Sequence, residues 1–453
     1  MPLSQVLPSR FLATIATVLL VGLTTAALGQ TPLYTLTVLG AVGGAGSVGY
    51  GVNNSGRVTG AAGATGNMSA HAFLSGPNGE PLTAANDLGT LGGVNSTAVA
   101  VNDTGQVTGG ADLADGYRHA FLSGPNGGPL QDLRSLPGKP NSFGFGINAS
   151  AQVAGYAITS DRYRPVPRAF LSAVNGGPLT DLGTLGGPTS FARAVNDDGQ
   201  VTGGADLADG TNHAFLSAAN GGLLKDLGTL GGPNSSGYGV NASGQVTGGA
   251  DLASGYSRAF LSGPNGVGLT DLGTLPGSLN SYGLGINASG QVVGSVLIAA
   301  GVTHAIVVTN AVMTDLNSLI PPNPGFTLAV AFGVSDTGFI TGYGRDTTGG
   351  QQAFLLTPIR TLIGLSFPAS VPGGTVVTAT VTLSGPAPVD TVVGLSSSDS
   401  SVVRLHRAVI VPAGSSSATF AINTYRSHTT KTVTIQATLG AVTQTGDLTI
   451  TGR

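Results

Sequence analysis

The stretch VNDTGQVTGGADLADGYRHAFL (Val101–Leu122) decides the fold, because close copies of it return along most of the chain. The third residue of the His-Ala-Phe triplet marks the copies. It stands at Phe73, Phe121, Phe170, Phe215, Phe260, Ile306 and Phe354. Successive copies are separated by 48, 49, 45, 45, 46 and 48 residues. A fixed period of this length is typical of propellers and solenoids, in which each repeat is one supersecondary unit.

Each repeat contains four short strand patterns. In the fourth copy they occupy residues 191–195, 200–205, 213–217 and 224–230, and clusters of Gly, Asn and Asp separate them. Short apolar runs bounded by such turn residues predict an antiparallel meander. Four strands in about 46 residues match the size of one propeller blade.

The strand count predicts a closed ring of seven blades. Turns with an Asn-x-x-Gly pattern give seven sets of first, second and third strands. They begin at Asn53, Asn102, Asn148, Asn196, Asn241, Asn287 and, in degenerate form, Ser335. Fourth strands follow only the first six sets, near Asp87, Asp132, Asp181, Asp226, Asp271 and Asp315.

A spare strand pattern precedes the first repeat, at residues 34–40. We predict that it pairs with residues 353–356 and completes the seventh blade, because ring closure removes exposed sheet edges. A right-handed β-helix is the alternative architecture. Its coils are usually shorter, and it would leave the spare strand unexplained.

The quoted stretch and its copies resemble the HAF family of extracellular repeats. The resemblance covers about residues 34–358, which we expect to form the β-propeller. It implies a secreted or cell-surface bacterial protein and gives little further indication of function.

The repeat ends near residue 359, and the remaining chain to residue 453 is rich in alternating β-branched residues, as in 375–383 and 431–437. This pattern predicts a small β-sandwich of the immunoglobulin-like (Ig-like) class. The segment resembles the bacterial Ig-like modules that act as spacers or contact surfaces. Because it contains no Cys or Trp, the prediction depends on strand pattern alone.

Residues 1–30 are predicted to be a secretory signal peptide. Arg10 supplies the positive charge, residues 11–28 are apolar, and residues 27–29 offer a small-x-small cleavage site. A retained membrane anchor is the alternative, since the apolar run approaches the length that spans a bilayer. No later segment is apolar for long enough, so we expect no membrane span after cleavage and a secreted or cell-surface location.

Composition excludes several classes of function. The net charge is −3 and only 9% of residues are charged, so no basic patch for nucleic acid is visible. The absence of cysteine excludes disulfides and thiolate metal sites. No nucleophile elbow, phosphate-binding loop or zinc-protease motif occurs. We therefore predict no catalytic residue, no metal site and no cofactor.

Two polar positions that recur in the repeats are interpreted as structural positions and not as metal sites. The Asn-x-x-Gly turns supply too few carboxylates for calcium, which prefers six to eight oxygens. They are interpreted as hairpin turns capped by the Asn side chain. Histidine recurs at one position of the repeat, at His71, His119, His213 and His304, and is replaced there by Arg168, Arg258 and Gln352. Residues spread in this way around a ring cannot converge on one metal, so we expect their polar tips to reach backbone carbonyl groups.

Candidate ligand-binding residues lie in the loops between second and third strands, on one predicted face of the propeller. The Asp-Leu-Ala loops supply Asp112, Asp206 and Asp251, and a basic loop supplies Arg162, Tyr163 and Arg164. The arginines favour an acidic ligand, with the tyrosine as a flat apolar surface beside it.

Two functions remain open on the sequence. The first is a non-enzymatic binding or structural protein that recognises an extracellular glycan or a surface protein through one propeller face. The second is an extracellular polysaccharide lyase or glycosidase on the same scaffold. Reactive side chains are scarce in the repeats, which favours the first.

Overall fold

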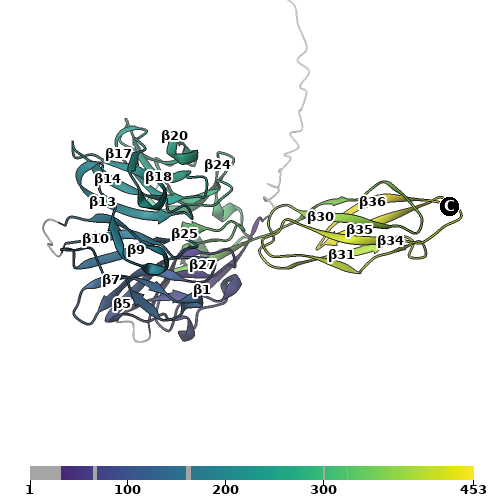
Figure 1. The fold of residues 1–453 in the computed structure, drawn as a ribbon, viewed down its shortest axis with the longest axis horizontal. Coiled ribbons are helices and arrows are strands. Elements are labelled where there is room, and N and C mark those ends of the chain that lie inside the picture. Colours follow the sequence, from purple (N-terminus) through teal and green to yellow (C-terminus); the bar gives the residue numbers. More distant parts are fainter. Residues whose placement is uncertain (1–31, 65–68, 160–164, 299–300, 324, 453) are drawn as a thin grey trace, which may run out of the picture. The chain divides into compact units, whose positions relative to one another are not determined.

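The computed structural model describes residues 32–64, 69–159, 165–298, 301–323 and 325–452. The predicted signal peptide and the predicted site residues Arg162, Tyr163 and Arg164 therefore lie outside the described residues. The described chain is almost entirely β-structure with short 3-10 turns (Figure 1). None of its helices is long and apolar enough to cross a membrane.

Seven separate antiparallel sheets form the propeller, and each is a meander in which consecutive strands pair. The first strands of blades 1 to 7 are β2 (Ser47–Val52), β5 (Gly92–Val101), β9 (Asn141–Ile147), β13 (Gly186–Val195), β17 (Gly231–Val240), β21 (Asn280–Ile286) and β25 (Phe326–Val334). The second strands are β3 (Val58–Gly63), β6 (Val107–Leu113), β10 (Val153–Ile158), β14 (Val201–Leu207), β18 (Val246–Leu252), β22 (Val292–Leu297) and β26 (Ile340–Asp346). The third strands are β4 (Ala70–Leu74), β7 (Arg118–Ser123), β11 (Arg168–Ser172), β15 (Asn212–Ser217), β19 (Ser257–Gly263), β23 (Thr303–Thr309) and β27 (Gln351–Pro358).

The fourth strands complete blades 2 to 7. They are β8 (Leu130–Asp132), β12 (Leu179–Asp181), β16 (Leu224–Asp226), β20 (Val267–Asp271), β24 (Val312–Asp315) and, for blade 7, β1 (Tyr34–Gly40). Short 3-10 turns join the strands: η1 (Pro77–Gly79), η2 (Ala84–Asn86), η3 (Pro125–Gly127), η4 (Val174–Gly176), η5 (Ala219–Gly221), η6 (Pro264–Gly266) and η8 (Leu316–Ser318).

The predicted ring closure is confirmed. β1 pairs antiparallel with β27, with Leu36 opposite Leu356 and Val38 opposite Phe354. Strand β1 thereby becomes the outermost strand of the sheet β1-β27-β26-β25. The seven-bladed propeller closed by its N-terminal strand is the observed architecture, and the β-helix alternative is excluded.

Several strand boundaries differ from the sequence prediction, and the fourth strand of blade 4, predicted over residues 224–230, ends already at Asp226. The first strands start earlier, because Gly186 already pairs with Leu207 across a bulge in blade 4, and blades 2 and 5 repeat this pairing. In blade 1 the expected fourth strand is reduced to a single bridge between Phe73 and Asp87. The chain before this bridge forms η2 instead, where the Thr83 side chain accepts a hydrogen bond from the backbone N–H of Ala85.

The core of the propeller lies between neighbouring blades. All seven residues of the His-Ala-Phe phenylalanine position are completely buried, as their strand pattern predicted. Phe73 shares one apolar cluster with Leu39 of β1 and Leu355 of β27, so the first and last blades pack as the others do. Glycine is required where the second strand of a blade lies closest to the backbone of the first strand. At Gly203 a Cβ would lie only 1.9 Å from the carbonyl oxygen of Phe191.

A serine near the middle or start of six first strands joins each blade to its predecessor. Ser96 Oγ accepts a hydrogen bond from the backbone N–H of Ala72, at 2.9 Å. The same bond recurs at Ser142, Ser190, Ser235, Ser281 and, across the closure, Ser47. These serines are buried, so each bond satisfies a backbone donor that water cannot reach.

The C-terminal strands form two further sheets around a core of their own. One sheet has the order β28-β30-β34-β32 and the other β29-β36-β35-β31-β33. The strands are β28 (Leu362–Ser366), β29 (Ser370–Pro372), β30 (Val376–Leu383), β31 (Thr391–Ser397), β32 (Val403–Arg404), β33 (Ala408–Val411), β34 (Ser417–Thr424), β35 (Lys431–Leu439) and β36 (Val442–Thr451). Their inward residues, among them Val381, Ile422 and Ile435, belong to one apolar cluster. This is the predicted arrangement of two packed sheets, and the Ig-like class itself stays a prediction.

Candidate functional site

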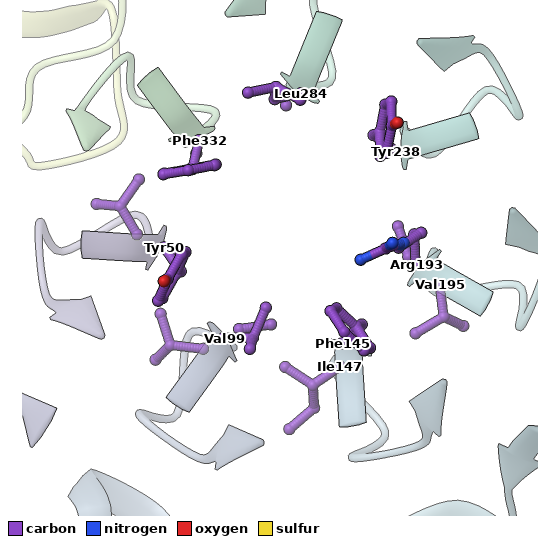
Figure 2. A pocket seen from close by; sticks show the side chains of 18 of the residues that line it. Tyr50, Val99, Phe145, Ile147, Arg193, Val195, Tyr238, Leu284 and Phe332 are labelled. Atoms are coloured by element: carbon purple, nitrogen blue, oxygen red, sulfur yellow. The ribbon is translucent and has the colours of Figure 1, made fainter. Parts of the chain in front are cut away.

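A cavity of about 530 Å³ lies where the first strands of all seven blades meet. Each blade contributes the residue three positions before its Asn turn, and Figure 2 shows these side chains around an open centre. They are Tyr50, Val99, Phe145, Arg193, Tyr238, Leu284 and Phe332. Alternate residues of a strand point to opposite sides, so this sequence position faces the centre in every repeat. We call this set the channel ring.

Aromatic residues dominate the channel ring. The rings of Tyr50 and Phe332 lie 5.1 Å apart between centroids. Phe145 lies 4.9 Å from Phe143, which lines the cavity nearer the start of the same strand. Flat apolar faces therefore border the cavity on several sides.

Arg193 is the one charged side chain among the described residues that line this cavity. Its guanidinium carbon lies 4.6 Å from the Phe145 ring centroid and 5.8 Å from the Tyr238 ring centroid. The two aromatic neighbours hold the cation through their negatively charged ring faces. Figure 2 shows the guanidinium directed from its strand toward the open centre.

Arg193 has no acidic partner among the described residues. None of the ion pairs formed within the described chain includes it. Its Nε is buried and has no hydrogen-bond partner among the described residues. A cation that is partly removed from water without a counter-charge is unfavourable, which makes this position a candidate binding site for an anion.

Burial also affects a tyrosine of the channel ring. Desolvation raises the pKa of the Tyr50 phenol above its ordinary value, and the neighbouring Tyr343 raises it further. The Tyr50 hydroxyl is protonated at neutral pH, as phenols ordinarily are, and can donate a hydrogen bond. Neither Tyr50 nor Tyr238 uses its hydroxyl in a hydrogen bond to another side chain or backbone group of the described chain.

An aliphatic collar follows the channel ring toward the Asn turns. It consists of Val52, Val101, Ile147, Val195, Val240, Ile286 and Val334. The collar residues also border a second, smaller cavity of about 240 Å³ at the Asn-turn end of the channel. Branched aliphatic side chains thus separate the aromatic cavity from the polar mouth beyond it.

The Asn turns themselves form a hydrogen-bonded circle at this mouth. The Nδ2 group of Asn53 donates to the carbonyl oxygen of Asn102 in the next blade, at 3.0 Å. The equivalent bonds from Asn102, Asn148, Asn196, Asn241 and Asn287 measure 3.0 to 3.2 Å. Between blades 7 and 1, Asn54 Oδ1 accepts from the backbone N–H groups of Asp336 and Thr337 instead.

The turn interpretation of Asn-x-x-Gly is confirmed. Asn102 Oδ1 accepts from the backbone N–H of Gln106, and Gly105 has the positive φ of +74° that this turn requires. The link from each Asn to the next blade was not predicted, because the sequence does not show which carbonyl group lies opposite the amide. Among the described residues, no group of three or more His, Asp and Glu side chains is placed to hold a metal ion.

Three carboxylates border the Asn-turn mouth. Asp103, Asp197 and Asp336 each follow the turn asparagine or serine directly. Each accepts a hydrogen bond from the backbone N–H of the corresponding residue in the preceding blade, which is Asn54, Ala149 or Ala288. These side chains support contacts between blades and give the mouth negative charge.

The predicted site residues Asp112, Asp206 and Asp251 lie within the second strands of blades 2, 4 and 5, one residue before each strand ends, and not in the following loops as predicted, because each strand continues to the next leucine. Each binds polar groups of its own blade: Asp112 pairs with Arg118 at 2.7 Å, Asp206 accepts from Thr189, and Asp251 accepts from Ser257. None of the three borders either channel cavity. Burial raises the pKa of Asp112, but the hydrogen bonds from Arg118 and Asn95 outweigh this and leave the pKa below its ordinary value.

The prediction for the histidine row was wrong in the identity of the partner. Nδ1 of His71, His119, His213 and His304 lies 2.6 to 2.9 Å from a carboxylate oxygen of Asp87, Asp132, Asp226 or Asp315. The reason is strand register. Phe121 pairs with Asp132, which makes His119 the diagonal neighbour of that carboxylate. Backbone carbonyl contact is added only at His71, whose Nε2 lies 3.2 Å from the oxygen of Val94.

Sequence reasoning overlooked Arg193. Its position is occupied by Tyr, Val, Phe or Leu in the other six repeats. A charged residue at an otherwise apolar or aromatic inward position would have identified it once the seven repeats were aligned on their Asn turns.

No known protein-family model and no curated protein matches the chain. Comparison with solved structures found TolB from Acinetobacter baumannii, at 12% sequence identity and a TM-score of 0.37. The match covers 56% of this chain and 63% of the TolB chain, so it spans less than two thirds of that protein. The strand pairing described above defines the present chain as an all-β protein with a seven-bladed propeller.

Proposed function

We propose that the protein is a secreted, non-enzymatic binding protein that recognises an extracellular ligand, a glycan or a surface protein, at the propeller channel. The observation that carries the proposal is the pairing of aromatic faces with one unpaired cation, Arg193, in the central cavity. Residues 1–30 and the HAF-type repeat support the extracellular location.

The cavity has the properties of a recognition site. Ligand sites commonly measure about 300–1,000 Å³ and combine a mainly apolar lining with a few placed polar groups. The channel cavity, at about 530 Å³, falls within this range and presents Arg193 together with the phenols of Tyr50 and Tyr238. The Asn-turn mouth offers fewer polar groups for a ligand, because its asparagines and aspartates already form hydrogen bonds between blades.

Binding is favoured over hydrolysis or elimination by the chemistry of the lining. Glycosidases commonly place two carboxylates on either side of the scissile bond. The described residues that line the aromatic cavity include no carboxylate and no imidazole. The carboxylates of Asp103, Asp197 and Asp336 border the other cavity and accept backbone hydrogen bonds.

The proposal can be tested with a pair of valines on one strand. Val99 belongs to the channel ring, whereas Val94 of the same strand is 61% exposed and outside the cavity lining. The purified protein, the V99W variant and the V94W variant would be applied to arrays of glycans and of extracellular proteins. We expect V99W to lose the binding of the wild type, because indole fills the cavity, and V94W to retain it.

Thermal unfolding of both variants shows whether the propeller remains intact. Binding that survives V99W would place the site outside the channel and overturn the proposal. Release of cleaved products from a bound polysaccharide would support the enzymatic alternative instead.

A further inference from the structure

We propose that Arg193 binds the carboxylate of a hexuronate residue, whose sugar ring lies against the aromatic residues of the channel ring. The inference rests on the proposed function and specifies the ligand class. The juxtaposition behind it is a guanidinium without an acidic partner, held between Phe145 and Tyr238 and directed into a cavity (Figure 2).

The Arg193 guanidinium has no acidic partner among the described residues, which indicates an anionic ligand. Elsewhere in the propeller, Arg118 and Arg168 form ion pairs with Asp112 and Asp181. Arg193 forms none within the described chain, and its Nε is buried without a partner. The two Nη groups of an arginine form a planar fork that matches the two oxygens of a carboxylate. The flanking rings hold this fork in place before the ligand arrives, which reduces the entropy lost on binding.

The phenol groups of Tyr50 and Tyr238 indicate that the ligand carries hydroxyl groups as well as a negative charge. The Tyr50 phenol is protonated at neutral pH, as phenols ordinarily are, so its hydroxyl can both donate and accept a hydrogen bond. Tyr238 lies next to Arg193 (Figure 2). Neither phenol hydroxyl forms a hydrogen bond within the described residues. An aromatic acid would satisfy the guanidinium but leave the neighbouring phenol of Tyr238 unused. A hexuronate carries both a carboxylate for Arg193 and hydroxyl groups for the phenol beside it.

The aromatic faces suit the remaining surface of such a ligand. Phe145 and Phe143 border the cavity along one strand with their ring planes 38° apart, and Tyr50 and Phe332 border it with their ring planes 53° apart. The axial hydrogens of a pyranose ring present an apolar patch that packs on faces of this kind. The cavity therefore offers one charged anchor, a phenol hydroxyl beside it and aromatic walls.

The test is isothermal titration of the full chain with glucuronate, glucose and benzoate. Glucose has the same ring with a neutral hydroxymethyl group, and benzoate has the carboxylate on an aromatic ring. We expect glucuronate to bind about tenfold to a hundredfold more tightly than glucose, as expected for a hydrogen bond to a charged group. Benzoate should bind more weakly than glucuronate.

Variants of Arg193 separate the contribution of the cation to ligand affinity from that of the other cavity residues. R193M keeps the length of the side chain, and its affinity for glucuronate should fall to that for glucose. R193K should be intermediate, because lysine lacks the fork. R345M is the matched control, since Arg345 also lies over a tyrosine ring, at 5.8 Å, but outside the cavity lining. It should bind as the wild type does.

Each contrary outcome is decisive. Equal affinity for glucuronate and glucose, unchanged binding by R193M, or tighter binding of benzoate would overturn the hexuronate assignment. If an array ligand is lost in V99W but not in R193M, the channel still binds and only the present inference fails. If V99W has no effect on any ligand, the proposed function fails with it.

Discussion

The side-chain oxygen of Ser47 accepts a hydrogen bond from the backbone N–H of Ala353, at 2.9 Å, although 306 residues separate them. Five equivalent serines make the same bond between consecutive blades. The first and last blades are therefore joined by the ordinary contact of the repeat, in addition to the pairing of β1 with β27. Ring closure holds the channel ring together, because the ring needs one residue from each blade.

A disulfide across the closure should stabilise the propeller. Thr35 and Thr357 are directly paired, and the chain has no cysteine that could interfere. We expect the T35C/T357C variant to form the bond on oxidation and to gain about 2–4 kcal/mol in unfolding free energy, because the cross-link restricts the unfolded chain. Thermal melts with and without reductant measure the gain. The misregistered pair T37C/T357C is the control, and an equal yield of cross-link there would contradict the observed register.

Phe215→Ala should cost about 3–5 kcal/mol of unfolding free energy, because it empties a completely buried core position. His213→Ala should cost about 1 kcal/mol or less, since its partner Asp226 is 40% exposed and such pairs contribute little. Urea unfolding of both variants gives the comparison. The reverse order would show that the histidine row has a role beyond the contact with the fourth strand.

Asn196→Asp should destabilise the circle at the Asn turns. The new carboxylate can still accept from the backbone N–H of Gln200, but it cannot donate to the carbonyl oxygen of Asn241. We expect a loss of about 1–3 kcal/mol, because a buried acceptor is left without its donor. Chemical denaturation provides the measurement. Asp198→Asn, in the exposed part of the same turn, is the control and should change stability by no more than about 0.5 kcal/mol.

Acid should weaken the propeller partly through Asp112. Its pKa is depressed in the folded state, since hydrogen bonds from Arg118 and Asn95 outweigh the effect of burial. Its contribution to stability is therefore present above the unfolded pKa of about 3.9 and is lost as the pH falls through the lower folded value. D112N should be less stable than the wild type at pH 7, and the difference should shrink toward pH 2.

Unfolding free energies across this pH range test the linkage. D115N, which removes an exposed carboxylate from the turn that follows β6, is the control for the loss of one negative charge and should change stability at pH 7 by no more than about 0.5 kcal/mol. A constant difference between D112N and the wild type at all pH values would show that the charge of Asp112 is not responsible.

The sequence by itself determined the architecture of this protein. The period of the His-Ala-Phe triplet, the Asn-x-x-Gly turns and the spare strand before the first repeat predicted seven blades and their closure. They did so because strand alternation and turn chemistry are local properties, repeated often enough to be counted. The burial of Phe215 and its counterparts followed from the same periodicity.

Only the tertiary structure decided which residues meet. The partners of His119 and Asn196 lie on other strands or other blades, and register fixed them. Arg193, Phe145 and Tyr238 belong to three different repeats and come together because ring closure turns one position of each first strand toward a common centre. A local pattern predicts which face of a strand is buried. The surroundings of Arg193 depend instead on how the blades pack, because its neighbours belong to repeats about 45 residues away.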